Sequence, residues 1–214
     1  DVIKFFVEND IPSHPCAEIL SFGLAAEHFH TTLMKFCIER ATKHPESQYN
    51  ICAFDRALYL AALNGHTAMV KLLTEDARTR PDKYQSYRFD DAIKAAARNG
   101  HASVVKLMVE DGQARPQADG SYALRCAAEN GHTEVVKLLL EDERAHPDCE
   151  DSYALRRAAS NGHIEIVQML IRDGRSRGNA RGSEALALAA NSRRNVVFLD
   201  GYVPATQEDH RRSF

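Results

Sequence analysis

The sequence predicts an all-α array of stacked helix-turn-helix repeats. The first observation is the stretch NGHTEVVKLLLED, which begins at Asn130 and recurs in altered form from Asn64, Asn99 and Asn161. The second is that one apolar position of this stretch recurs along the chain in steps of 31, 36, 35, 31, 31 and 31 residues. Such a period indicates a solenoid, in which each unit packs only against its neighbours.

Each unit is expected to form a helix, a tight turn, a second helix and an extended loop. In the unit from Ser121, this serine is a candidate N-cap of the first helix, and Gly131 suits the left-handed residue that ends that helix. Thr133 is a candidate N-cap of the second helix. Paired small residues would let neighbouring first helices approach closely, at Ala25-Ala26, Ala61-Ala62, Ala96-Ala97, Ala127-Ala128, Ala158-Ala159 and Ala189-Ala190.

The period divides the chain into one solenoid, over residues 1–203, and a polar tail over 204–214. The expected units are 1–17 (a half repeat), 18–54, 55–89, 90–120, 121–151, 152–182 and 183–203 (a degenerate cap). The half repeat carries an apolar helix without its partner. We therefore expect upstream repeats or another subunit to cover it.

The pattern ALRxAAxNGHxEVVKLLLED resembles the ankyrin repeat, whose motif runs roughly TPLHxAAxxGHxxVVxxLLxxGA. Tyr122-Ala123-Leu124-Arg125 replaces the family's Thr-Pro-Leu-His segment, and the unit has 31 residues in place of 33. The resemblance implies a right-handed, curved solenoid of about six units that binds protein partners through its concave face and loop tips.

Composition and charge bound the possible functions. The chain has 214 residues, of which 44% are hydrophobic and 27% are charged, as in a folded protein. No apolar run approaches the ~18 residues that span a bilayer, so membrane insertion is not expected. Five scattered cysteines suit a reducing compartment. We expect an intracellular, cytoplasmic protein, with a nuclear location left open.

No motif in the sequence points to catalysis. The in-register histidines His66, His101, His132 and His163 are expected to make turn hydrogen bonds. Stacked helices lie ~8–10 Å apart, too far for such a row to share one metal ion. The sequence has no nucleophile elbow, phosphate-binding loop or zinc-protease motif. We therefore expect no catalytic residue, cofactor, metal site or small-molecule substrate.

Charge is uneven along the chain. Residues 1–155 carry a net charge of −7, whereas the arginine-rich residues 156–214 carry +4. Two interpretations stay open: a surface for an acidic partner or nucleic acid, or a polar cap with bridges to acidic neighbours. Few aromatic residues lie among these arginines, which argues against nucleic acid.

Two loops are longer than their counterparts, at residues 39–55 and 75–90, and both contain aromatic residues. These side chains could be buried against the stack or could form a binding platform, and the sequence favours neither. The predicted partner-binding set joins them to the loop tips and first-helix ends that the resemblance to ankyrin repeats implies as contact positions: Tyr49, Phe54, Tyr84, Tyr87, Phe89, Asp90, Arg98, Ser121, Glu129, Glu150, Asp151, Ser152, Ser160 and Ser183.

The function expected from these features is non-catalytic binding of a protein partner, as an interaction module or scaffold. Two alternatives remain. One is a structural linker or cement subunit of a large assembly, and the other is the recognition arm of a longer enzyme or effector.

Overall fold

The computed structural model describes residues 23–42, 48–75, 86–112 and 114–176. Residues 23–27 are helical. The remaining elements are α3 (Thr31–Thr42), α4 (Gln48–Leu63), α5 (Thr67–Glu75), α6 (Ser86–Arg98), α7 (Ala102–Asp111), α8 (Ala118–Asn130), α9 (Thr133–Glu141), α10 (Cys149–Ser160) and α11 (Ile164–Asp173).

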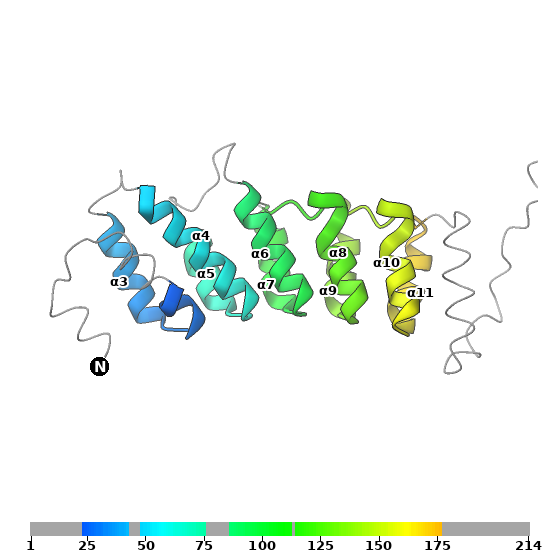
Figure 1. Cartoon of the computed structure of the whole chain (residues 1–214), viewed down its shortest axis with the longest axis horizontal. Coiled ribbons are helices and arrows are strands. Elements are labelled where there is room, and N and C mark those ends of the chain that lie inside the picture. Colours follow the sequence, from blue (N-terminus) through cyan, green and yellow to red (C-terminus); the bar gives the residue numbers. More distant parts are fainter. Residues whose placement is uncertain (1–22, 43–47, 76–85, 113, 177–214) are drawn as a thin grey trace, which may run out of the picture.

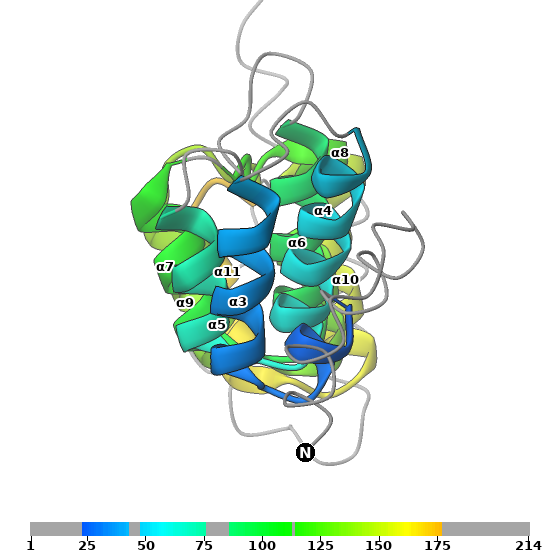
Figure 2. The ribbon, with the colours of Figure 1, turned by 90° about the vertical axis from the view of Figure 1, so that its left-hand side faces the viewer.

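The helices stand in one row that follows the order of the chain (Figure 1). Viewed along the row, they form two layers (Figure 2). One layer contains the first helices of the units, α4, α6, α8 and α10, and the other contains the second helices, α3, α5, α7, α9 and α11. Each of these first helices contacts its own second helix and the first helix of a neighbouring unit. The predicted solenoid of helical pairs is therefore confirmed.

The turn between the two helices of each unit has the predicted left-handed glycine. The φ angles are +73°, +77°, +79° and +77° at Gly65, Gly100, Gly131 and Gly162. The prediction for the start of the second helix is wrong, because the N-cap of α9 is His132 and not Thr133. Its side chain makes no capping hydrogen bond, since the ring reaches the preceding unit instead.

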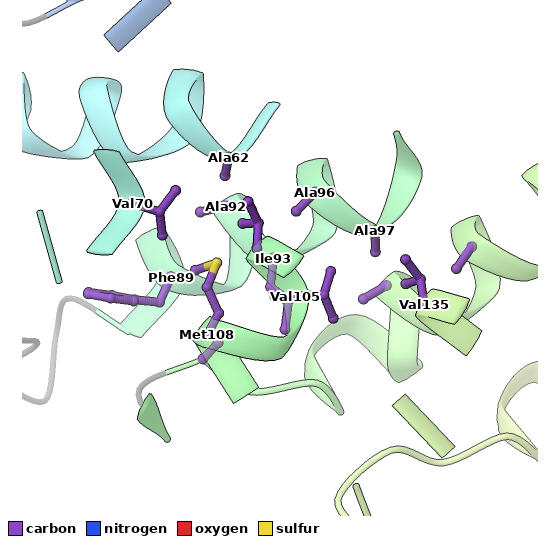
Figure 3. Packing of buried hydrophobic residues seen from close by; sticks show 14 of the residues in the cluster. Ala62, Val70, Phe89, Ala92, Ile93, Ala96, Ala97, Val105, Met108 and Val135 are labelled. Atoms are coloured by element: carbon purple, nitrogen blue, oxygen red, sulfur yellow. The ribbon is translucent and has the colours of Figure 1, made fainter. Parts of the chain in front are cut away.

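The core is continuous from unit to unit. Every described alanine of the predicted pairs is at most 2% exposed, from Ala25 to Ala159. In Figure 3 the α6 pair, Ala96 and Ala97, lies in one cluster with Val105 of α7 and Val135 of α9. The small alanine pairs of the first helices and larger apolar side chains from both layers therefore fill the space between the layers.

The in-register histidines join neighbouring units rather than acting within their own turn. Their Nε2 atoms lie 3.2, 2.9, 2.9 and 3.0 Å from main-chain carbonyl oxygens at the end of the preceding first helix. A carbonyl oxygen only accepts, so Nε2 is the donor in each case. The pairs, in chain order, are His66 with Glu27, His101 with Leu63, His132 with Arg98 and His163 with Glu129.

Three of these rings, His101, His132 and His163, also pack on the glycine of the preceding turn. A Cβ atom on Gly131 would lie 2.6 Å from Cε1 of His163, and Gly65 and Gly100 are covered in the same way. The glycine is therefore required twice, for its positive φ and for the space that the next ring occupies.

Two arginines, one period apart, bind carbonyl oxygens at the C-terminal ends of the second helices. The Arg144 guanidinium donates to the Asp142 carboxylate, with the shortest distance 2.6 Å, and to the carbonyl oxygens of Val109 and Ala114 at 3.3 Å. Val109 lies in the last turn of α7, and its carbonyl oxygen also accepts the backbone N–H of Gly112, the C-cap of that helix. Arg175 repeats this arrangement one period later, on Asp173, Leu140 and Ala145.

The first insertion lengthens a first helix rather than only a loop. Helix α4 begins at Gln48 and has 16 residues, against 12 for α10, whereas α6 begins at Ser86 and has 13 residues, as α8 does. All of residues 48–55, and the last five of 75–90, are helical and not loop as predicted. In the described residues, the inserted aromatics Phe54 and Phe89 are only 4% and 2% exposed. For these two, the burial alternative is confirmed.

Candidate functional site

Five of the predicted partner-binding residues are buried. Phe54, Phe89, Asp90, Ser121 and Ser152 are each at most 4% exposed. Their predicted placement on an accessible surface is therefore wrong, because no partner reaches such side chains without rearranging the units.

Asp90 and Ser121 are buried because they hold the loop of the next unit. The Asp90 carboxylate accepts the backbone N–H of Arg115 at 2.9 Å and the Arg115 Nε and Nη2 at 3.0 and 2.5 Å. One period later, the Ser121 hydroxyl accepts the backbone N–H of His146 at 2.8 Å. The prediction that Ser121 is the N-cap of its own helix is therefore wrong. Its hydroxyl instead accepts a hydrogen bond from the loop of the following unit.

The predicted loop tips lie in the first turns of α8 and α10, where they form short left-handed turns. Asp119, Gly120 and Ser121 have φ angles of 50°, 63° and 55°, and Glu150 and Ser152 repeat this conformation with 51° and 57°. Such angles are unfavourable for residues with a side chain, so contacts must hold the turn in place. Arginines six residues further on supply them, because Arg125 and Arg156 donate to the carbonyl oxygens of Asp119 and Glu150.

The acidic side chains of these tips pair with the first helix of the preceding unit. Lys94 of α6 contacts the Asp119 carboxylate, and Arg125 of α8 contacts that of Glu150. The hydrogen bond and positive charge of Lys94 lower the pKa of the Asp119 carboxyl group. Burial acts to lower the pKa of Lys94, but its hydrogen bonds with Asp119 and Asp91 outweigh this and raise it. Glu150, predicted as a binding residue, is thus exposed but already paired.

The other predicted residues divide into three groups. Arg98 and Ser160 are exposed and Glu129 is partly exposed, all near the ends of first helices as predicted. Tyr49, Tyr87 and Asp151 lie in α4, α6 and α10, and their side chains are not described. Tyr84 and Ser183 lie outside the described residues.

Two of the predicted residues line a groove on the outer face of the first helices. This first-helix groove has a volume of about 330 Å³ and spans three units, with lining residues Arg98, Tyr122, Arg125, Cys126, Glu129, Asn130, Tyr153 and Asn161. The sequence pattern predicts Arg98 and Glu129 but not the tyrosines. A signal was present, because Tyr122 and Tyr153 are one period apart and each precedes an arginine by three residues.

Stacked tyrosine and arginine side chains shape the groove. The Arg125 guanidinium carbon lies 5.3 Å from the ring centroids of both Tyr122 and Tyr153, and Arg157 lies 5.1 Å from the Tyr153 ring. These distances suit cation–π contacts. Arg157 Nε also donates to the Tyr153 hydroxyl at 2.8 Å. Tyr122 forms a hydrogen bond with the Cys126 thiol, and this bond raises the pKa of the phenol.

The described residues offer no place for a metal ion. In that part of the chain, no three His, Cys, Asp or Glu side chains are arranged to hold one. Cys37 and Cys126 are buried thiols, and burial raises the pKa of the partly exposed Cys149, so these thiols suit packing rather than nucleophilic chemistry. No helix among the described residues has both the length and the apolar character to cross a membrane.

Comparison with known families decides the identity of the fold. A family model described as ankyrin repeats, in three copies, matches residues 22–118 and 58–151, which together make up more than half of the chain. The chain belongs to the ankyrin-repeat family. No curated protein matches it. Ankyrin repeats are generally protein–protein interaction modules, and the fold is typically non-catalytic.

The ankyrin units also explain part of the arginine-rich C-terminal third. Arg175 is committed to the second-helix ends, and Arg156 and Arg157 lie beside the first-helix groove. Arg172 is exposed at the end of α11. Arg175 and Arg156 therefore stabilise the array by donating to carbonyl oxygens, whereas the exposed Arg157 and Arg172 leave both interpretations open.

Proposed function

We propose that this ankyrin-repeat chain is a non-catalytic module that holds a protein partner on the exposed face of its first helices, centred on the first-helix groove. The observation that carries the proposal is the shared groove itself. Three consecutive units contribute to it, with tyrosine and arginine side chains at its centre. Tyrosine and arginine are over-represented among the residues that dominate interface energies.

The side chains of the groove are already ordered, so a partner can bind with little loss of their conformational entropy. Arg125 is stacked between two tyrosine rings and tied to Glu150 of the next unit, so three side chains are fixed before any partner arrives. Ordering of flexible side chains is one of the main costs of association. A surface that is ordered in advance avoids most of this cost, and the tip contacts of Asp119 and Glu150 hold its edge.

Site-specific photocrosslinking in cells tests the proposal. A photoreactive amino acid at Arg98 or Ser160 samples the first-helix face, and the same residue at Ser103 or Lys137 samples the second-helix face as a matched control. All four positions are exposed, so the insertion should not disturb the core.

We expect covalent adducts with a protein partner from the first-helix positions only. Equal adducts from both faces would contradict a single docking face and favour a structural subunit surrounded by partners. Absence of adducts from all four positions, with the chain folded and expressed, would contradict the binding function.

A further inference from the structure

The first-helix groove carries excess positive charge in a chain of net negative charge. We propose that it recognises an acidic segment of the partner, with Arg98 and Arg157 binding carboxylate groups. This inference rests on the proposed binding function and adds the chemical class of the ligand. Arg98 lies on α6 and Arg157 on α10, the two helices that flank α8.

Arg98 is the lining cation that is still available. Within the described part of the chain, its exposed guanidinium makes no hydrogen bond or ion pair. Its backbone carbonyl oxygen accepts the hydrogen bond from the His132 ring. A guanidinium offers five N–H donors in a planar fork that matches a carboxylate. Arg98 therefore has the geometry and the free capacity for an acidic side chain.

Arg125, by contrast, is already committed. Its Nη1 contacts Glu150, its Nη2 donates to the Asp119 carbonyl oxygen, and its side chain is only 13% exposed. It acts as a positioning residue, because it fixes the spacing of Tyr122 and Tyr153 and adds charge beneath the ligand.

Arg157 is held only weakly by its acidic neighbour. Its Nε lies 3.6 Å from the Glu129 carboxylate, well beyond the ~2.7–2.9 Å of a charge-assisted hydrogen bond. The same Nε already donates to the Tyr153 hydroxyl. A partner carboxylate that approaches the terminal nitrogens of Arg157 thus competes with a long ion pair rather than a strong one.

The groove and a hollow on the opposite face have linings of opposite charge. The groove lining holds two arginines and one glutamate, a net charge of +1, from Arg98, Arg125 and Glu129. Arg156 and Arg157 lie beside it, over the Tyr153 ring. A hollow on the second-helix face holds two cations and four acidic groups, a net charge of −2: Lys106, Arg144, Glu110, Glu141, Asp142 and Glu143. An acidic segment is therefore attracted to the first-helix groove and repelled from the opposite face.

Selection from a displayed library of short random peptides tests the inference on the whole chain. The bait is the unmodified chain, the Arg98→Gln/Arg157→Gln double variant, or the Arg172→Gln variant as a matched control with the same change on α11. Circular dichroism first establishes that the three proteins have the same helix content. One selected peptide and its twin, with Asp and Glu changed to Asn and Gln, are then measured by fluorescence anisotropy.

We expect the selected peptides to share an acidic position. Their affinity should fall about tenfold or more in the double variant and in the amide twin, and should stay unchanged in Arg172→Gln. Higher salt should weaken binding, because the contact depends on charge.

Three other outcomes would overturn the inference, and they differ in what they leave standing. Selected peptides without an acidic position leave the binding function intact. Self-association of the chain that the double variant abolishes would make a second copy the occupant. Failure to select any peptide above a chain-free surface would count against both the acidic ligand and the proposed function.

Discussion

The glycine at the turn of one unit and the histidine of the next should be energetically coupled. Gly131 has φ of +79°, and a Cβ atom there would lie 2.6, 2.8 and 3.0 Å from three atoms of the His163 ring. Real Cβ atoms do not approach that closely, so Gly131→Ala must displace the ring. The displaced ring loses its 3.0 Å hydrogen bond to the Glu129 carbonyl oxygen.

The cost of Gly131→Ala has two parts. A left-handed alanine costs about 1–2 kcal/mol relative to glycine, and the lost hydrogen bond adds about 1 kcal/mol. We therefore expect the free energy of unfolding to fall by about 2–3 kcal/mol. Gly112→Ala is the control for the backbone part, because Gly112 has φ of +73° and a Cβ atom there would meet no described atom within 4 Å. It should cost only about 1–2 kcal/mol.

A double-mutant cycle with His163→Ala separates the two parts. Without the ring, Gly131→Ala should cost only its backbone part, so the cycle should give a coupling of about 1 kcal/mol. The assay is urea unfolding followed by far-ultraviolet circular dichroism, with the comparison limited to variants of unchanged slope. Equal costs of Gly131→Ala with and without the ring would refute the role assigned to the histidine.

Three further predictions concern contacts between units. Asp90→Ala should lower the free energy of unfolding by about 2–3 kcal/mol, since Arg115 loses three hydrogen bonds; Asp90→Ser, the residue found one period later, should cost less than half as much in the same urea assay. Arg144→Gln should lower the free energy of unfolding by about 1–2 kcal/mol and speed amide hydrogen exchange at the end of α7. Unchanged exchange there would contradict the role of Arg144 in holding that helix end. Burial acts to raise the pKa of Asp142, but the Arg144 hydrogen bonds outweigh it and the pKa is lowered. Its contribution is therefore complete above the unfolded pKa of about 3.9 and is lost as pH falls through the folded pKa, so Asp142→Asn should be destabilised at pH 7 but not at low pH.

The repeating features of the fold could be predicted because each occurs in several repeats of the sequence. Gly131 and the alanine pairs recur in register, and each copy has the same backbone or packing requirement. The insertions occur once each, so no second copy showed whether Phe54 and Phe89 lie in loops or extend helices. The hydrophobic pattern suits both arrangements equally.

The candidate site could be predicted only in part, because variation between units does not by itself mark a free surface. Asp90 and Ser121 differ in identity, which favours an exposed position. They share one chemical property, since both accept a hydrogen bond from the next loop, and comparison by acceptor rather than by residue type would have shown it. Tyr122 and Arg125 stand out in the sequence only as departures from a family motif, and their stacking across units depends on distances that the sequence does not contain.

The histidine-to-glycine contact has a consequence for how such a chain changes length. The structural turn of one copy is completed by a side chain from the copy that follows, so each boundary is shared between two copies. Loss of one whole 31-residue copy, residues 121–151, would bring His163 over Gly100 in place of His132 and recreate the same contact. Duplication of a whole repeat also preserves this contact, whereas loss of half a repeat leaves a histidine ring without its glycine. Gain or loss of whole repeats therefore requires no new interface between units. Sequence change can then concentrate on the exposed face of the first helices.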